Sequence, residues 1–475
     1  MRRLMTRATA VVAAVVAAGA LGVSAADAAT QAPHPARTSP LTAARPQAVP
    51  GAKLWLQRYN GPGNGSDAAR SVAVSPDGGK VFVTGESKGA TPGTDPSDYL
   101  TVAYNAATGT QLWTARYKGP GTYDDAQAVT VSPDGAAVYV TGSSEQGSGQ
   151  FGDYATVAYR ASDGTQVWVA RFNGPANDGD YATALSVARD GTQVFVTGRS
   201  RGADNRISFA TVAYRASDGS QLWVGRYAQG NRGVSNAIVS PGGNRVFVTG
   251  YVQSKLGTAE YGTVAYNATT GAQLWARTYA GQGATSIAAS PDRTTVYVTG
   301  ESHFNYGTLA YNARTGARLW ARFYGSRRRI DGASSVAVSP GGRVVVTGTS
   351  HGYDYYATVA YSPAGDQLWA RRYNIPGIPP PPGGSDFARA VAAPGNGRVY
   401  VTGASWGGSA TGYDYATIAY NIRTGAQVWL RRYNGPASSG DDASSLAARG
   451  GRVLVTGASV GTTSGDDYAT IAYNG

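Results

Sequence analysis

The chain contains no cysteine, and its only histidines are His34, His303 and His351. Without cysteine there is no disulfide framework, so the stability of the fold has to come from packing. No two of the histidines have the spacing of a metal-ligand pair. No G-x-S-x-G motif stands at a strand-to-helix turn, so there is no recognisable nucleophile elbow. These absences favour a protein that is not an enzyme, and we assign no catalytic and no metal-binding residue.

Helical periodicity is also missing beyond the first residues. No segment after residue 50 repeats apolar residues every 3.6 positions, so we predict no helix in the mature chain. Residues 1–28 have the pattern of a secretory signal peptide, with three early arginines, an apolar run over 8–22 and a cleavage site at Ala26-Asp27-Ala28. The apolar run is shorter than the roughly 20 residues of a membrane span. We expect a secreted protein, extracellular or associated with the cell envelope, without an integral membrane segment after cleavage.

Two kinds of sequence follow the signal pattern. Residues 29–50 contain five prolines and few apolar side chains, which predicts an extended linker. Residues 51–475 are built from a repeat, typified by the stretch 101–116, TVAYNAATGTQLWTAR. The repeat is anchored by eight tryptophans that lie 45 to 60 residues apart: Trp55, Trp113, Trp168, Trp223, Trp275, Trp320, Trp369 and Trp429.

One repeat unit predicts four short strands. The segments Ala68–Val74, Lys80–Gly85, Tyr99–Tyr104 and Gln111–Tyr117 are rich in β-branched, aromatic or small residues. Tight turns or loops that contain Gly, Pro, Asn or Asp separate them. A four-stranded sheet cannot bury both its faces alone, and radial packing against its neighbours solves this problem. We therefore predict an all-β fold, an eight-bladed β-propeller of four-stranded antiparallel blades over residues 51–475.

The two ends of the repeat region complete one unit. The last unit stops inside a turn, at Asn474-Gly475, and the segment Gly51–Trp55 matches Gly109–Trp113. The N-terminal segment therefore supplies the fourth strand of the last blade. This arrangement predicts a ring that is closed without a covalent link.

The stretch Ala103–Trp113 resembles the tryptophan-docking motif of the quinoprotein (PQQ) dehydrogenases, A-x-D-x-x-T-G-K-x-x-W. The resemblance extends over residues 51–475, although the unit that ends at Trp369 is one residue short. It implies that the eight tryptophans dock against neighbouring blades. Those dehydrogenases also carry paired cysteines beside their cofactor, and this chain has none. The resemblance therefore does not carry PQQ binding over to this protein.

Within the motif, two positions change together. The third position is usually Asn and the sixth usually Thr, as in Asn105 and Thr108. In two units the third position is Arg and the sixth is Asp, namely Arg160 with Asp163 and Arg215 with Asp218. We predict that the two positions touch across the turn, as a hydrogen bond in most units and as an ion pair in these two.

Positive charge is spread along the chain. The formal net charge of +12 falls to +10 when the signal segment leaves with three arginines and one aspartate. One arginine recurs on each predicted fourth strand, which is not the footprint of a nucleic-acid site, so we interpret the set as structural. It comprises Arg58, Arg116, Arg171, Arg226, Arg277, Arg322, Arg372 and Arg432.

The long, variable loops all fall on one face of a propeller, and function concentrates on such loops. Six aspartates begin the predicted first strands on this face: Asp67, Asp124, Asp180, Asp331, Asp386 and Asp441. The other two units have Arg232 and Gln282. The aspartates either cap their own loops or form a cation funnel at the tunnel mouth, and repetition favours capping. Trp406, the one tryptophan outside the repeat, is either a stacking platform for a ligand or part of the loop packing.

These patterns favour a non-catalytic binding or interaction scaffold that works through the variable-loop face. The partner is an unknown protein or polysaccharide, and we expect a monomer that needs no cofactor. The alternative is a secreted quinone-dependent oxidoreductase or a lyase with its active site at the tunnel mouth. Only this alternative requires PQQ with calcium.

Overall fold

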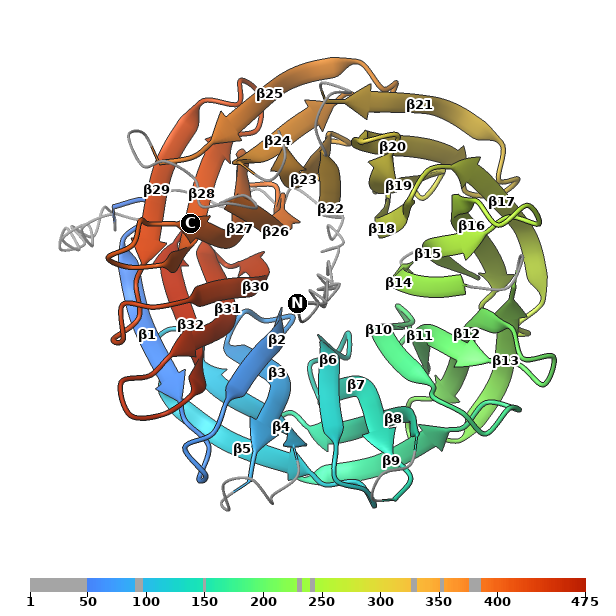
Figure 1. Ribbon diagram of the computed structural model, residues 1–475, viewed down its shortest axis with the longest axis horizontal. Coiled ribbons are helices and arrows are strands. Elements are labelled where there is room, and N and C mark those ends of the chain that lie inside the picture. The colour runs from blue at the N-terminus through green and yellow to red at the C-terminus, as the bar shows by residue number, and fades with distance from the viewer. Residues whose placement is uncertain are drawn as a thin grey trace, which may run out of the picture.

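The computed structural model describes residues 49–89, 97–147, 151–228, 233–239, 244–325, 331–350, 354–375 and 386–475, and for 233–239 it describes the backbone alone. The predicted signal peptide and most of the predicted linker lie outside these residues, as do His34, Arg232 and His351. The described chain forms strands and no helix, and the strands make eight four-stranded antiparallel sheets arranged in a ring (Figure 1). The predicted eight-bladed propeller is confirmed.

The blades are numbered in chain order, and each contributes four strands from the tunnel outward. Blades one to four comprise β2 (Asp67–Val74), β3 (Lys80–Lys88), β4 (Ser97–Asn105), β5 (Gln111–Tyr117); β6 (Asp124–Val131), β7 (Ala137–Glu145), β8 (Gly152–Arg160), β9 (Gln166–Phe172); β10 (Tyr181–Val187), β11 (Gln193–Arg201), β12 (Ile207–Arg215), β13 (Gln221–Tyr227); β14 (Gly233–Val239), β15 (Arg245–Gln253), β16 (Ala259–Asn267) and β17 (Gln273–Ala280).

Blades five to eight follow the same order, except that the last blade takes its outer strand from the start of the chain. They comprise β18 (Gly283–Ala289), β19 (Thr295–Ser302), β20 (Asn305–Asn312), β21 (Arg318–Tyr324); β22 (Gly332–Val338), β23 (Val344–Ser350), β24 (Tyr355–Tyr361), β25 (Gln367–Tyr373); β26 (Asp386–Ala392), β27 (Arg398–Trp406), β28 (Tyr413–Asn421), β29 (Gln427–Tyr433); β30 (Asp441–Arg449), β31 (Arg452–Val460), β32 (Asp466–Asn474) and β1 (Lys53–Tyr59).

The ring closes where the two ends of the described chain meet. Strand β1 pairs antiparallel with β32 and forms the outer edge of blade eight (Figure 1). The N–H of Gly51 donates to the carbonyl of Asn474 at 2.7 Å, as Gly109 does to Asn105 inside an unbroken turn at 2.8 Å. One hairpin turn is thus assembled from both ends of the chain, as the sequence predicted.

The core lies between the blades rather than inside them. Trp113 of β5 is 7% exposed, and its indole N–H donates to the carbonyl of Ala161 in blade two at 3.2 Å. Its ring covers Gly164, where an added Cβ would lie 2.6 Å from the indole. Because that glycine also has φ +75°, a larger residue there meets both backbone strain and a clash. Six other tryptophans donate in the same way to the next blade: Trp55, Trp168, Trp223, Trp275, Trp320 and Trp369.

Trp429 makes the same contact without the hydrogen bond. Its ring packs against Gly51 in the assembled turn, yet its buried indole nitrogen has no partner among the described residues. The packing is therefore common to all eight junctions, and the hydrogen bond belongs to seven.

The covarying positions of the motif touch across the turn, as predicted. The side-chain oxygen of Asn105 accepts the N–H of Thr108 at 3.1 Å. In the two variant units, Arg160 pairs with Asp163 and Arg215 with Asp218, both at 3.2 Å. Both partners of each pair are about half exposed, so these pairs contribute little to stability.

The outer-strand arginines fall into two positions, which corrects the single series of the sequence interpretation. Arg116 and five others lie three residues after the docking tryptophan, whereas Arg277 and Arg322 lie only two residues after it. Arg277 donates to the carbonyls of Thr315 and Gly316 in the next blade's turn. Arg371 makes the equivalent contacts with Thr424 and Gly425. Because every blade has at least one arginine on its outer strand, a count per blade does not show whether it lies two or three residues after the tryptophan.

Candidate functional site: the variable-loop face

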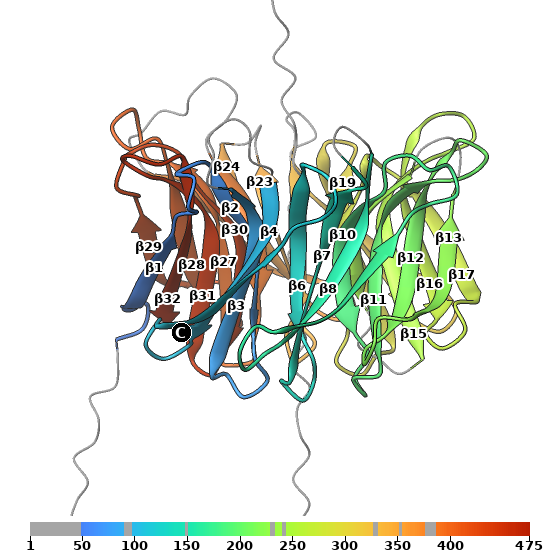
Figure 2. The same cartoon turned by 90° about the horizontal axis from the view of Figure 1, so that it is seen from below.

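We use the term variable-loop face for the end of the ring that carries two sets of loops. One set joins each outer strand to the next inner strand, and the other joins the second strand of a blade to its third. Both sets lie at the upper face in Figure 2, opposite the short hairpin turns and the C-terminus. The six aspartates, Trp406 and the entrance to the tunnel all belong to this face.

The aspartates are the inner members of a polar network that repeats from blade to blade. In blade two, the carboxylate of Asp124 accepts the N–H of Gly119 at 2.7 Å, which closes the loop that enters β6. The Ser144 hydroxyl lies beside this carboxylate and accepts from Arg171 at 2.6 Å. Arg171 then pairs with Asp153 at 3.4 Å. A chain of contacts therefore links the tunnel side of the blade to its outer strand.

The same contacts recur in other blades. Asp67, Asp180 and Asp441 accept the N–H of Gly61, Gly174 and Gly435. Asp386 instead accepts the N–H of Trp406 at 3.2 Å. All six aspartates are at most 2% exposed. These are the contacts of a loop cap; a response of the set to a cation stays a prediction.

Burial is the largest influence on the pKa of Asp67, Asp124, Asp180, Asp386 and Asp441. It raises the pKa of Asp67, Asp124, Asp180 and Asp441, and the neighbouring serine hydroxyl and glycine N–H limit the rise. For Asp386, burial raises the pKa to about 6. A carboxylate that already accepts main-chain N–H groups and is hidden from solvent is poorly placed to meet a ligand.

The tunnel wall carries a polar ring that the sequence interpretation missed. Every inner strand has a β-bulge, and the residue at the bulge is polar in all eight blades: Arg70, Gln127, Thr183, Asn236, Thr285, Ser334, Arg389 and Ser444. A bulge breaks the strand's alternation, so period-two analysis cannot predict it. The sequence clue to the bulge is a polar residue inside an inner strand whose other residues are mostly apolar or small.

Four of the bulge residues contact the next blade. Thr285 donates to the carbonyl of Ala333 at 2.7 Å, and Ser444 donates to that of Ala69 at 2.6 Å. Arg389 pairs with Asp442 at 2.9 Å. Arg70 lies 3.9 Å from Asp125 and pairs with Glu86 of its own blade at 2.7 Å. The polar ring therefore links adjacent blades around the tunnel.

Trp406 ends β27 and takes part in loop packing. Its ring meets Tyr413 edge-on, with centroids 5.2 Å apart, and Tyr413 also contacts Phe387. The side chain of Trp406 is half-buried. The rest of its surface remains a candidate for ligand contact, which stays a prediction.

The most exposed apolar side chains of this face were not singled out by the sequence interpretation. Tyr123, Phe151, Leu256 and Phe304 are 49%, 60%, 91% and 51% exposed. All four lie in the loops of the variable-loop face. Among the described hairpin turns of the opposite face, Val49 is the only large apolar side chain that is exposed. In the sequence, each of these residues is an apolar residue inside a polar, variable loop, and this pattern could have identified it.

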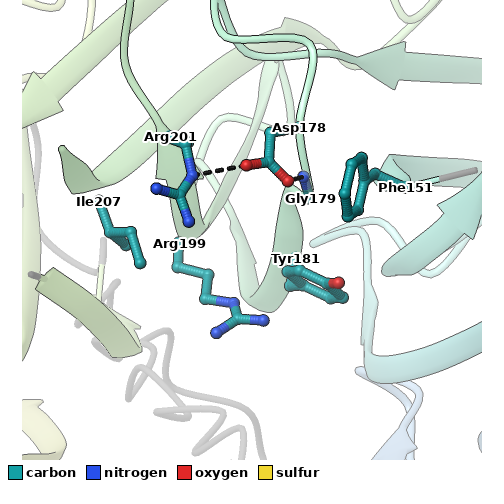
Figure 3. Close-up of a pocket in the computed structure, with 7 residues that line it drawn as sticks. All are labelled: Phe151, Asp178, Gly179, Tyr181, Arg199, Arg201 and Ile207. Atoms are coloured by element: carbon teal, nitrogen blue, oxygen red, sulfur yellow. Dashed lines mark hydrogen bonds and ion pairs between the residues drawn. The ribbon is translucent and has the colours of Figure 1, made fainter. Parts of the chain in front are cut away.

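Blade three carries a pocket of about 200 Å³ at this face (Figure 3). Phe151, Tyr181 and Ile207 supply apolar walls, and Arg199 and Arg201 supply positive charge. The ring of Tyr181 packs against Gly179, where an added Cβ would lie 2.7 Å from it. The pocket thus combines aromatic surface with cations.

The quinone and calcium of the dehydrogenases do not fit the residues in view. Within the described ranges, no group of three or more His, Asp or Glu side chains is arranged to hold a metal ion. All six aspartates are buried, and Asp67, Asp124, Asp180 and Asp441 accept N–H groups of their own incoming loops. We therefore derive no chemistry through that cofactor. In the part of the chain that the structure describes, there is no helix that is long and apolar enough to cross a membrane.

Comparison with known proteins agrees with the architecture. The family profile described as outer membrane protein assembly factor BamB matches residues 42–304, 208–376 and 305–470. No curated protein matches the chain. The crystal structure of BamB from Moraxella catarrhalis is similar at a TM-score of 0.51 and 12% identity, over 90% of this chain and 100% of that one.

Two dehydrogenases show a comparable likeness. The quinohemoprotein alcohol dehydrogenase from Comamonas testosteroni has a TM-score of 0.53 and 13% identity, over 89% of this chain and 76% of its own. A europium-containing methanol dehydrogenase has a TM-score of 0.51 and 9% identity, over 89% and 93%. At such identities the likeness shows the propeller fold alone.

Proposed function

The chain belongs to the family described as outer membrane protein assembly factor BamB, and from that premise we propose that it is an exported, non-catalytic scaffold that binds another protein through its variable-loop face. The observation that carries the proposal is the exposure of Tyr123, Phe151, Leu256 and Phe304 on that face. Aromatic residues are enriched at protein interfaces, and exposing them to water has a cost that a bound partner removes.

The frame beneath the loops suits this role. The aspartate caps and the bulge contacts tie loop bases to a rigid blade or to its neighbour, and the docking tryptophans hold adjacent blades together at the opposite end. A loop held at both ends loses little conformational freedom when it binds, so more of its contact energy becomes affinity. Four outer-strand arginines of the frame, Arg58, Arg116, Arg171 and Arg432, pair with aspartates of their own blades.

The destination of the protein is part of the same proposal. The arginines and apolar run of residues 1–28 have the pattern of an export signal. We place the propeller outside the cytoplasm, in the cell envelope or the medium, as a monomer. The dehydrogenase or lyase alternative rests on fold likeness alone, and we do not propose it.

The experiment is affinity capture from cell-envelope and culture-medium fractions with three full-length proteins. The loop-face variant is F151A/F304A, and the matched control is L112A, which removes an exposed leucine on the outer strand β5. We expect a protein, identified by mass spectrometry, that the wild type and L112A retain and F151A/F304A loses. Capture that both variants retain or both lose, or no captured protein, would contradict the proposal. Uptake of PQQ with calcium and dye-linked alcohol oxidation would favour the enzyme instead.

A further inference from the structure

The pocket of blade three contains a cation without an internal partner. The guanidinium of Arg199 stacks on the ring of Tyr181, 4.1 Å from its centroid. Among the described residues no carboxylate lies within ion-pair distance of Arg199. Stacking occupies the face of a guanidinium and leaves the N–H groups at its edge available. Arg199 therefore presents a planar set of donors in the pocket.

The other cation of the pocket is already paired. Arg201 contacts Asp178 at 2.6 Å (Figure 3). It also donates to the side chain of Asn205 at 2.9 Å. The second oxygen of Asp178 accepts the N–H of Gly179 at 2.6 Å. Two arginines and one aspartate leave the lining with one net positive charge, and that charge belongs to Arg199.

Two arginines at the bulges of other inner strands, on the tunnel side, have acidic partners. Arg70 pairs with Glu86 and Arg389 with Asp442. The position of Arg199, directly after the glycine of the second strand, is Glu86 in blade one and Glu301 in blade five. Blade three thus has a cation where these blades have a carboxylate, and its counter-charge is missing from the described fold.

The pocket walls around Arg199 indicate which chemical group lies next to the carboxylate in a ligand that Arg199 would bind. Phe151, Tyr181 and Ile207 offer apolar surface on the sides of the pocket, and Phe151 is 60% exposed. A volume of about 200 Å³ holds one or two side chains and not a large cofactor. An amphipathic anion, with a carboxylate next to an apolar group, meets both kinds of surface at once.

We propose that this pocket binds a short acidic segment of the partner protein, with a carboxylate on Arg199 and the neighbouring apolar side chain between Phe151 and Ile207. The proposal rests on the proposed function, since it names the chemistry by which the loop face recognises a protein. Guanidinium and carboxylate form paired, charge-assisted hydrogen bonds that fix orientation as well as affinity. A uronic-acid polysaccharide carries carboxylates too, but it lacks the apolar side chain that the walls fit.

The test is fluorescence anisotropy with the full-length protein and a labelled octapeptide of alternating leucine and glutamate. The comparison peptide alternates leucine and glutamine, and a galacturonic acid oligomer represents the polysaccharide class. The variant is R199Q, and the matched control is R189Q, which removes the same charge from an exposed turn on the opposite face of the same blade. F151A, at a side chain that is mostly in solvent, tests the apolar wall without disturbing the core.

We expect the acidic peptide to bind, R199Q to weaken binding by about tenfold and R189Q by less than about twofold. F151A should weaken it by roughly threefold, and the glutamine peptide should bind no better than R199Q binds the acidic one. Equal losses in R199Q and R189Q, no binding of the acidic peptide, or binding of the galacturonic acid oligomer alone would each overturn the proposal. Any of these results would contradict the assignment of this pocket. The proposed function would still hold if affinity capture depends on Phe151 and Phe304.

Discussion

Blade two and blade five hold their loops on the variable-loop face with different side chains at the first position of the blade. In blade two, the buried carboxylate of Asp124 closes the incoming loop, and Arg171 holds the serine and aspartate beside it. In blade five the corresponding first position is Gln282, whose side-chain oxygen accepts the N–H of His303 at 3.0 Å. Phe323 occupies the place of Arg171. The blade with a neutral cap has no arginine at that position.

The pairing of the two changes shows what the arginine is for. Six blades have both the aspartate and an arginine three residues after the docking tryptophan, while blades four and five have neither. A buried carboxylate needs compensation for lost hydration, and an amide does not. In blade five an amide oxygen thus replaces the carboxylate as the acceptor of a loop N–H, so the charge is one of two ways to supply that acceptor. This comparison argues against a ligand role for the aspartates.

The largest effect should come from a feature that the two blades share. Trp113 docks on blade two and Trp275 on blade five, both through an indole hydrogen bond and a glycine contact. Replacing either with alanine leaves a buried cavity, so W113A and W275A should each lower the free energy of unfolding by about 3–5 kcal/mol. Denaturant unfolding measures both. A difference of more than about 2 kcal/mol between them would mean that the cap chemistry also governs docking.

A smaller effect should separate the two blades. R171A removes donors to Ser144, Glu145 and Asp153, and leaves buried acceptors behind, so we expect a loss of about 2 kcal/mol. F323A in blade five removes a side chain that is 44% exposed, and should cost less than about 1 kcal/mol. Urea unfolding of the two variants makes the comparison. Equal losses would show that Arg171 stabilises by packing alone.

A further effect concerns pH and a change from a charged to a neutral cap. The pKa of Asp386 is raised by burial to about 6, above its ordinary value, so the folded state holds this proton more tightly. The stability that the proton provides is fully present below about pH 4 and is lost as the pH rises through about 6. D386N should therefore show a smaller fall in unfolding free energy between pH 4 and 7, by at most about 3 kcal/mol. Identical pH profiles for D386N and wild type would contradict this.

The sequence was sufficient for the architecture because the architecture is repetitive. The tryptophan and glycine of each unit recur in register, and the terminal fragments Gly51–Trp55 and Asn474-Gly475 complete one another. The covariation of Arg160 with Asp163 also predicted a contact that is present. These features are local or periodic, so a single sequence contains them several times over.

The site was less predictable, because its geometry depends on departures from the period. The bulge that places Arg70 and Arg389 in the tunnel wall breaks the alternation of the strand. The link between Asp124 and Arg171 joins an inner strand to an outer one, and the simple count of one arginine per blade placed Arg277 in the wrong series. The pocket of blade three depends on how Phe151 from one blade meets Tyr181 from the next, which no repeat pattern specifies.

The central claim is that the aspartates belong to the frame, and that binding takes place on the exposed loop side chains. Thermal melting with and without calcium tests it most directly, in the wild type and in the triple variant D67N/D180N/D441N. An amide oxygen accepts the loop N–H as a carboxylate does, so we predict closely similar melting temperatures and no calcium shift in either protein. A clear calcium-dependent rise in the wild type that disappears in the triple variant would contradict the claim, because only a cation bound to the folded carboxylates produces it.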